Sequence, residues 1–310
     1  MPSEITIPEI HSFEQIHALA RLKARKTCRR GALVVPSQID SLRAFLRASA
    51  DDLLRPVIVG DEKLLRTNAE KHDLDLADIE ILNIKEPDKA VQTAALMAAR
   101  GEIDFMVQGR VTGETLLSLL LQRQMQFRLP GKRLSHVAVM QPQRYPKLLL
   151  LTDGAVTPRP DLATKASLVG NVVSVANAIG MADPRLAAVC AVEVVYPQMP
   201  ATVEAAALTL MSDRNQIKGA IVEGPLSFDV AVDMEAAHAK GIYDSQVAGQ
   251  ADGFVVSSIE VAQGVYTAMS LYGECPIGGV VVGGRVPVAL NATVDSPEDR
   301  YNSIALATLV

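Results

Sequence analysis

Asp299 is the acid best placed to take part in chemistry. It lies where a short apolar run passes through a polar turn into a helix. Residues 286–290 predict a strand, and the residues after Ser296 predict the helix. Ser296 is a favourable N-cap, and Asp299 follows it at the spacing of a capping box. A helix N-terminus after a strand is also where α/β proteins commonly bind anions. Two interpretations of Asp299 therefore stay open: a capping carboxylate, or a catalytic carboxylate at the lip of a cleft.

A second candidate anion site follows the apolar run 104–107. Gly109, Arg110 and Thr112 combine a fixed cation, a hydroxyl group and the start of a helix, which suits a phosphate or a carboxylate. The alternative makes Thr112 an ordinary N-cap and Arg110 a solvated side chain.

Other polar groups stand at the ends of two further apolar runs. Asp153 ends one run and could orient a turn or a substrate, and Glu223, Gly224 and Pro225 end another. Glu223 could gather with Asp229 and Asp233 around a divalent cation. Because Asp229 begins a helix predicted to run to Lys240 and Asp233 lies one turn on, solvated helix acids are the alternative. The five histidines show no ligand spacing, so no metal site is predicted.

The elements that must position these groups alternate between strand and helix. The apolar runs show no polar alternation, which is typical of strands buried on both faces of a mostly parallel sheet. Such sheets bind ligands beyond the carboxyl ends of their strands. The predicted strands are 31–35, 56–60, 79–84, 104–107, 135–140, 147–151, 186–192, 219–222, 253–256, 279–282 and 286–290.

A turn-rich basic segment, residues 127–133, interrupts the alternation and predicts a hinge. The runs 135–140 and 147–151 are joined too closely for a crossover helix, so they predict an antiparallel hairpin. The expected fold is α/β, with two α/β domains of mostly parallel sheets and a cleft between them. Residues 1–134 with 288–310 form the first expected domain, and residues 135–287 form the second.

Composition excludes several classes of protein. The net charge is −5 and no basic cluster is long enough to follow a nucleic acid backbone. No apolar run reaches the ~18 residues that a membrane span needs. Three cysteines without metal or redox spacing fit a reducing cytosol, and Cys190 is expected to pack within a strand.

Six segments resemble the phosphate acetyl/butyryltransferase family, and its butyryl branch more closely. They are residues 135–139, 150–153, 191–195, 200–206, 217–225 and 303–307. The resemblance runs in order from about Pro56 to the C-terminus. It implies an architecture like that of isocitrate and isopropylmalate dehydrogenases, usually in a homodimer, and exchange of coenzyme A and phosphate on an acyl group. No tightly bound cofactor is implied, because coenzyme A is a substrate.

The resemblance also implies site residues, and here the sequence departs from the family. The family acid, the base toward the coenzyme A thiol, falls on Asp299. The serine and arginine expected seven and six residues earlier fall on Ala292 and Thr293. Arg110 stands where the family usually has an aliphatic residue, so it could supply the missing cation, while Thr293 keeps a hydroxyl group.

The expected protein is a cytoplasmic, dimeric acyltransferase that moves a butyryl or acetyl group between coenzyme A and phosphate. Asp299 and Thr293 are the expected catalytic residues. The expected substrate-binding residues are Gly109, Arg110, Thr112, Asp153, Glu223, Gly224, Pro225 and Ala292. One alternative is a non-catalytic relative that binds coenzyme A or an acyl phosphate as a sensor or scaffold. The other is a metal-dependent hydroxyacid dehydrogenase, which would need Glu223, Asp229 and Asp233 to converge.

Overall fold

The computed structural model describes residues 10–310, which form two compact α/β units. The discontinuous unit contains residues 17–136 and 276–310. The central unit contains residues 137–275 and the segment that ends at Ile16. Helix α1 (Phe13–Ala24) crosses the division after Ile16. The domain boundaries expected at 134/135 and 287/288 stay a prediction.

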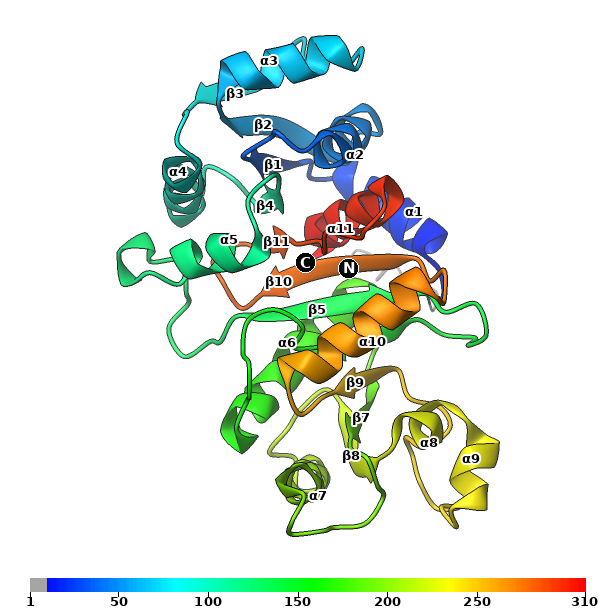
Figure 1. Ribbon diagram of the computed structural model, residues 1–310. Coiled ribbons are helices and arrows are strands. Elements are labelled where there is room, and N and C mark those ends of the chain that lie inside the picture. The colour runs from blue at the N-terminus through cyan, green and yellow to red at the C-terminus, as the bar shows by residue number, and fades with distance from the viewer. Residues whose placement is uncertain (1–9) are drawn as a thin grey trace, which may run out of the picture. The chain divides into compact units, whose positions relative to one another are not determined.

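The discontinuous unit has the strand order β3-β2-β1-β4-β11-β10 (Figure 1). All neighbouring pairs are parallel except β10 and β11, which are antiparallel. Its strands are β1 (Arg29–Val34), β2 (Leu54–Gly60), β3 (Glu80–Asn83), β4 (Phe105–Gln108), β10 (Ile277–Val282) and β11 (Val288–Ala289). Its helices are α2 (Ile39–Ala50), α3 (Glu62–Lys71), α4 (Pro87–Ala99), α5 (Gly113–Leu120), the 3-10 helix η1 (Arg123–Met125) and α11 (Pro297–Leu309).

The central unit has the strand order β5-β6-β9-β7-β8. Strands β5 and β6 form the predicted antiparallel hairpin, and the other neighbours are parallel. The strands are β5 (Ser135–Met140), β6 (Leu149–Thr152), β7 (Arg185–Val189), β8 (Ile221–Leu226) and β9 (Gly253–Val255). The helices are α6 (Leu162–Ala178), α7 (Pro200–Asp213), α8 (Phe228–Val232), α9 (Met234–Ala239) and α10 (Ile259–Leu271). The predicted α/β class with mostly parallel strands is confirmed.

Two local predictions need correction. Strand β7 ends at Val189, so Cys190 lies just beyond the strand and is only partly buried. The helix predicted from Asp229 to Lys240 is two helices, because Asp233 takes an extended conformation between them. The Asp233 carboxylate accepts hydrogen bonds from the backbone N–H groups of Glu235 and Ala236, so it caps α9. A capping aspartate competes with helix continuation at that position.

The core of the discontinuous unit is built around α11, drawn in red in Figure 1. This helix contacts α2, β4, β10 and β11, and every residue from Asp299 to Leu309 is buried. A helix buried on all sides has no separate polar face. Its polar side chains must therefore find partners inside the protein. Within residues 10–310, no helix has both the length and the continuous apolar character needed to cross a lipid bilayer.

Candidate functional site

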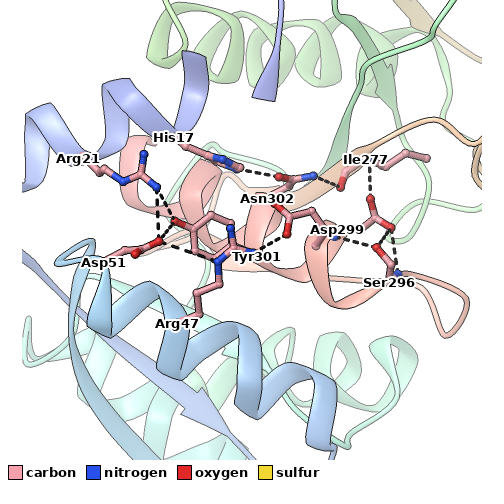
Figure 2. A network of polar contacts seen from close by, with 10 residues as sticks. His17, Arg21, Arg47, Asp51, Ile277, Ser296, Asp299, Tyr301 and Asn302 are labelled. Atoms are coloured by element: carbon pink, nitrogen blue, oxygen red, sulfur yellow. Dashed lines mark hydrogen bonds and ion pairs between the residues drawn. The ribbon is translucent and has the colours of Figure 1, made fainter. Parts of the chain in front are cut away.

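The start of α11 confirms the predicted capping box. Ser296 Oγ accepts a hydrogen bond from the Asp299 backbone N–H at 3.2 Å, and Asp299 Oδ2 accepts one from the Ser296 backbone N–H at 3.0 Å. Pro297 occupies the first helical turn, where its missing N–H costs no hydrogen bond. Figure 2 shows the Asp299 carboxylate between Ser296 and the backbone of Ile277.

Asp299 does more than cap the helix. Its Oδ1 accepts a hydrogen bond from the Ile277 backbone N–H at 2.9 Å, and Oδ2 also accepts one from Ser296 Oγ at 2.7 Å. The residue is 8% exposed. These donors orient the carboxylate rigidly at the first residue of β10. Its catalytic role stays a prediction.

The polar turn before α11, residues 291–295, is held at its base and exposed at its tip. The Asn291 backbone N–H donates to Gln108 Oε1 at 2.9 Å, which ties the end of β11 to the end of β4. The Ala292 backbone N–H donates to Asp295 Oδ2 at 2.7 Å. Thr293 is exposed at the tip. Ala292 and Thr293 therefore lie on an ordered turn, and their match to a family serine and arginine stays a prediction.

The second predicted anion segment lies at the same strand edge. The Gly109 backbone N–H donates to the Val34 carbonyl, and that of Arg110 donates to the Val35 carbonyl at 2.7 Å. A side chain at position 109 would clash with these carbonyls, because an added Cβ would lie 2.0 Å from the Val35 oxygen. Gly109 thus permits a close backbone approach between two strand ends.

The contacts of Thr112 and the exposure of Arg110 agree with the simpler interpretation, an ordinary N-cap and a solvated side chain. Thr112 Oγ1 accepts a hydrogen bond from the Thr115 backbone N–H at 3.2 Å, so Thr112 is the N-cap of α5. Arg110 is exposed. Binding of a substrate by either residue stays a prediction.

A residue that the sequence did not single out, Arg300, joins these two segments. It is 3% exposed, and its Nη1 donates to Ser41 Oγ at 3.2 Å and its Nη2 to the Ala292 carbonyl at 3.2 Å. With the Gln38 amide oriented to suit its neighbours, its oxygen accepts from Arg300 Nη2 at 2.8 Å and its nitrogen donates to the Gly109 carbonyl at 3.2 Å. The sequence holds one indication that Arg300 is unusual: it lies near the N-terminal end of a predicted helix, where a cation opposes the helix dipole.

In the central unit, Asp153 organises the loop after β6. Its carboxylate accepts hydrogen bonds from three successive backbone N–H groups, those of Ala155, Val156 and Thr157, at 2.9–3.1 Å. The residue is 2% exposed. The expected role in orienting a turn is thus seen directly, and a contact with substrate stays a prediction.

The segment Glu223 to Pro225 lies within β8 rather than after it. Glu223 Oε2 accepts hydrogen bonds from Ser245 Oγ at 2.8 Å and from the Gln246 backbone N–H at 3.2 Å. The Gly224 backbone N–H donates to Thr209 Oγ1 at 2.9 Å, and Thr209 Oγ1 also contacts the Gly224 carbonyl at 2.9 Å. Asp153 follows β6 and Glu223 lies on β8, and β9 and β7 separate these two strands.

The three acids required by the dehydrogenase alternative have separate partners. Glu223 binds Ser245 and Gln246, and Asp233 caps α9. Asp229 Oδ1 accepts from Ser227 Oγ at 2.5 Å and lies within hydrogen-bond distance of Lys240. Within residues 10–310, no group of three or more histidine, cysteine or acidic residues could hold a metal ion. The convergence that this alternative requires is therefore not found.

A polar network supports α11 from the side of α1 and α2 (Figure 2). The ring Nε2 of His17 lies 2.8 Å from Asn302 Oδ1, and Asn302 Nδ2 donates to the Ile277 carbonyl at 3.3 Å. Tyr301 donates its hydroxyl proton to Asp51, and this hydrogen bond holds the pKa of Asp51 below its usual value. Burial, reinforced by Asp51, raises the pKa of Tyr301 to about 12. This network fixes α11, and with it the strand-end edge where Asp299 and Arg300 stand.

Comparisons with known proteins agree with the family resemblance of the sequence. A family model described as phosphate acetyl/butaryl transferase matches residues 87–308. A phosphate butyryltransferase of Clostridium acetobutylicum is 39% identical over 301 residues, covering 97% of this chain and 98% of the relative. A phosphate acetyltransferase of Thermotoga maritima is 33% identical over 297 residues, covering 96% and 99%. The crystal structure of a branched-chain phosphotransacylase from Enterococcus faecalis superimposes with a TM-score of 0.75 at 28% identity, covering 90% and 99%.

Proposed function

Because the chain belongs to the phosphate acetyl/butyryl transferase family, we propose that it transfers a short-chain acyl group, butyryl or acetyl, between coenzyme A and phosphate. The full-length similarity to named phosphate butyryl- and acetyltransferases supports this proposal. Coenzyme A is a substrate here, and the proposal includes no tightly bound cofactor and no metal.

The observation that carries the proposal is the geometry of Asp299. The acid that matches the family base is present, and three hydrogen bonds hold its carboxylate at the strand edge. In one direction Asp299 accepts the proton of the coenzyme A thiol, and the thiolate attacks the carbonyl carbon of the acyl phosphate. Phosphate leaves and takes the proton from Asp299, which gives hydrogen phosphate and the acyl thioester. In the other direction hydrogen phosphate gives its proton to Asp299 as its oxygen attacks the thioester, and the departing sulfur takes that proton from Asp299.

We assign the other predicted residues roles in acyl transfer from their positions. Thr293 and Thr112 offer hydroxyl groups to the phosphate, and Arg110 offers an exposed cation. The Gly109 and Ala292 segments form the turns that carry them. Asp153 and the segment from Glu223 to Pro225 are proposed to shape the substrate-binding loops of the central unit.

The proposal extends to architecture and cellular setting. It includes a fold of the isocitrate and isopropylmalate dehydrogenase type, a homodimer and a cytoplasmic location. The family resemblance supports the first two. The three cysteines show no metal or redox spacing in the sequence, which supports the third.

Thiol release from butyryl-CoA and acetyl-CoA in the presence of phosphate tests the activity. We expect release that depends on phosphate, and an Arg110→Ala variant with lower phosphate-dependent turnover. An unchanged rate in that variant would remove Arg110 from the proposed site.

A second candidate function is favoured by Ala292 and Thr293. Without the family serine and arginine, the chain could be a relative that binds coenzyme A or an acyl phosphate as a sensor or scaffold. Losing one preorganised donor commonly lowers a rate by ~10²–10³-fold. Absence of turnover together with calorimetric binding of coenzyme A would select this function over catalysis.

A further inference from the structure

The guanidinium of Arg300 is a buried cation whose partners are all uncharged. Among the described residues, it donates to Ser41 Oγ, the Ala292 carbonyl and the Gln38 amide oxygen, and forms no ion pair. Its Nε–H is buried and has no acceptor within residues 10–310. A buried charge normally requires a counter-charge as well as hydrogen bonds. The described residues therefore give Arg300 hydrogen bonds but no ion pair.

Among the described residues, none of the nearby acids forms an ion pair with Arg300. Asp299 accepts from Ser296 and Ile277, and the exposed Glu298, in the first turn of α11, pairs with Arg47. Asp295 Oδ2, in the same turn as Ala292, accepts from Asn291 and the Ala292 backbone. Asp40, in the first turn of α2, forms no ion pair with Arg300.

Two helix N-termini add positive potential at the same place. Ser41 lies in the first turn of α2, whose N-cap Gln38 makes no side-chain capping bond. Arg300 itself stands in the fourth position of α11. The N-terminal ends of helices carry partial positive charge, which repels a cation and attracts an anion. The placement of Arg300 is thus unfavourable unless an anion is bound nearby.

The cluster reaches from the interior to the surface. Ser41 and Arg300 are buried, Gln38 and Ala292 are half-buried, and Thr293 is exposed. These groups lie where β1, β4 and β11 end, the edge at which parallel sheets bind ligands.

We propose that Arg300 is the fixed phosphate-binding cation of this protein and takes the place of the arginine that Thr293 replaces. This inference rests on the proposed function, since it assigns the phosphate of that reaction to the cluster of Gln38, Ser41, Ala292 and Arg300. Inorganic phosphate accepts charge-assisted hydrogen bonds from the guanidinium, which compensates its charge.

The test compares Arg300→Met with Arg300→Lys, and uses Arg43→Met as the matched control. Arg43 is an exposed arginine on α2, so its substitution removes the same charge outside the cluster. Two quantities are measured: the rise in Tm caused by inorganic phosphate relative to sodium chloride at equal ionic strength, and the KM for phosphate and for butyryl-CoA.

We expect Arg300→Met to lose the phosphate-dependent rise in Tm and to raise the KM for phosphate about 10- to 100-fold. The KM for butyryl-CoA should change less than about twofold. Arg300→Lys keeps the charge but not the fork geometry, so we expect an intermediate phosphate KM. Arg43→Met should behave like the unmodified protein. Without phosphate, Arg300→Met should be at least as stable as the unmodified protein, because it removes an uncompensated buried charge.

The outcomes separate this inference from the proposed function. A folded Arg300→Met variant that keeps the phosphate-dependent rise in Tm, or the phosphate KM, overturns the assignment of Arg300 while leaving the transfer activity intact. If Arg300→Met does not fold, an unchanged phosphate KM in Arg300→Lys overturns it equally. Phosphate stabilisation that requires Arg300, without turnover of any acyl-CoA, supports the anion site and contradicts the transferase.

Discussion

Asp299 and Arg300 are adjacent in sequence, but their charged side chains have different kinds of partners. The carboxylate of Asp299 accepts hydrogen bonds from Ser296 and Ile277, whereas the guanidinium of Arg300 has only neutral partners. A substitution at position 299 therefore changes both stability and any catalytic proton transfer, and the two effects must be separated by a control.

Asp299→Asn keeps one oxygen acceptor but removes the base. We expect thiol release to fall by ~10²–10⁴-fold, the usual contribution of general base catalysis. The free energy of unfolding should fall by about 1 kcal/mol through the weakened cap. Ser296→Ala is the control, because it costs a similar ~1 kcal/mol of capping and leaves the carboxylate with its two hydrogen bonds from backbone N–H groups. Equal loss of turnover in both variants would show that Asp299 acts only through structure.

Introducing the serine and the arginine that the family resemblance leads us to expect tests whether their absence limits the rate. Ala292→Ser together with Thr293→Arg should raise kcat/KM at least about tenfold if the serine is a missing donor to the reacting carbonyl. If Arg300 already binds the phosphate, Ala292→Ser alone should give most of that gain and Thr293→Arg little. A gain that comes from Thr293→Arg alone would instead show that the phosphate site lacks a cation.

Short-range features of the site could be predicted from the sequence, and long-range ones could not. The cap formed by Ser296 and Asp299 depends on a spacing of three residues, so it is visible in the sequence. The partner of Arg300 at Ser41 lies 259 residues away, and the hydrogen bond from Ile277 to Asp299 spans 22. Such contacts follow from packing, which residue types and spacing do not specify.

At the scale of elements, α11 depends on a few polar ties because it is buried throughout. Asn302 is 1% exposed and joins His17 to the Ile277 carbonyl. Asn302→Ala removes both hydrogen bonds inside the core, so we expect a loss of about 1–3 kcal/mol in the free energy of unfolding. Urea denaturation measures this loss. The same change at the exposed Asn177 of α6 should leave stability within about 0.5 kcal/mol.

The elements themselves follow largely from apolar patterning, and their interruptions follow from side-chain contacts. The hairpin of β5 and β6 was predictable because its connection is too short for a crossover. The interruption at Asp233 was not, since an aspartate one turn into a helix looks like a solvated acid. Its capping bonds to Glu235 and Ala236 decide the outcome.

At the scale of the whole molecule, two buried histidines predict loss of stability in acid. Burial lowers the pKa of His136 from 6.5 to about 4 and also lowers that of His17. Each is neutral in the folded protein but gains a proton on unfolding below about pH 6.5. The stabilisation is therefore complete above pH 6.5 and decreases as the pH falls toward 4. His136 alone should contribute a slope of up to ~1.4 kcal/mol per pH unit.

Urea denaturation between pH 7.5 and 4.5 measures that slope. His136→Gln cannot take up a proton, so its free energy of unfolding should decrease less steeply than that of the unmodified protein over this range. The variant is expected to be less stable at pH 7.5, because the ring packs in the core. Parallel curves for the two proteins would mean that other groups cause the acid sensitivity.

The discontinuous unit also has a consequence for synthesis. Its sheet needs β10 and β11, and its core needs α11, all of which are translated after the central unit. At ~5–20 residues per second, the ribosome takes roughly 7 to 28 s to make the 137–275 stretch. During that interval β4 lacks its neighbour β11, and the nascent chain presents an open strand edge to other chains. The newly made protein should therefore depend most on chaperones in the period before its last 35 residues emerge.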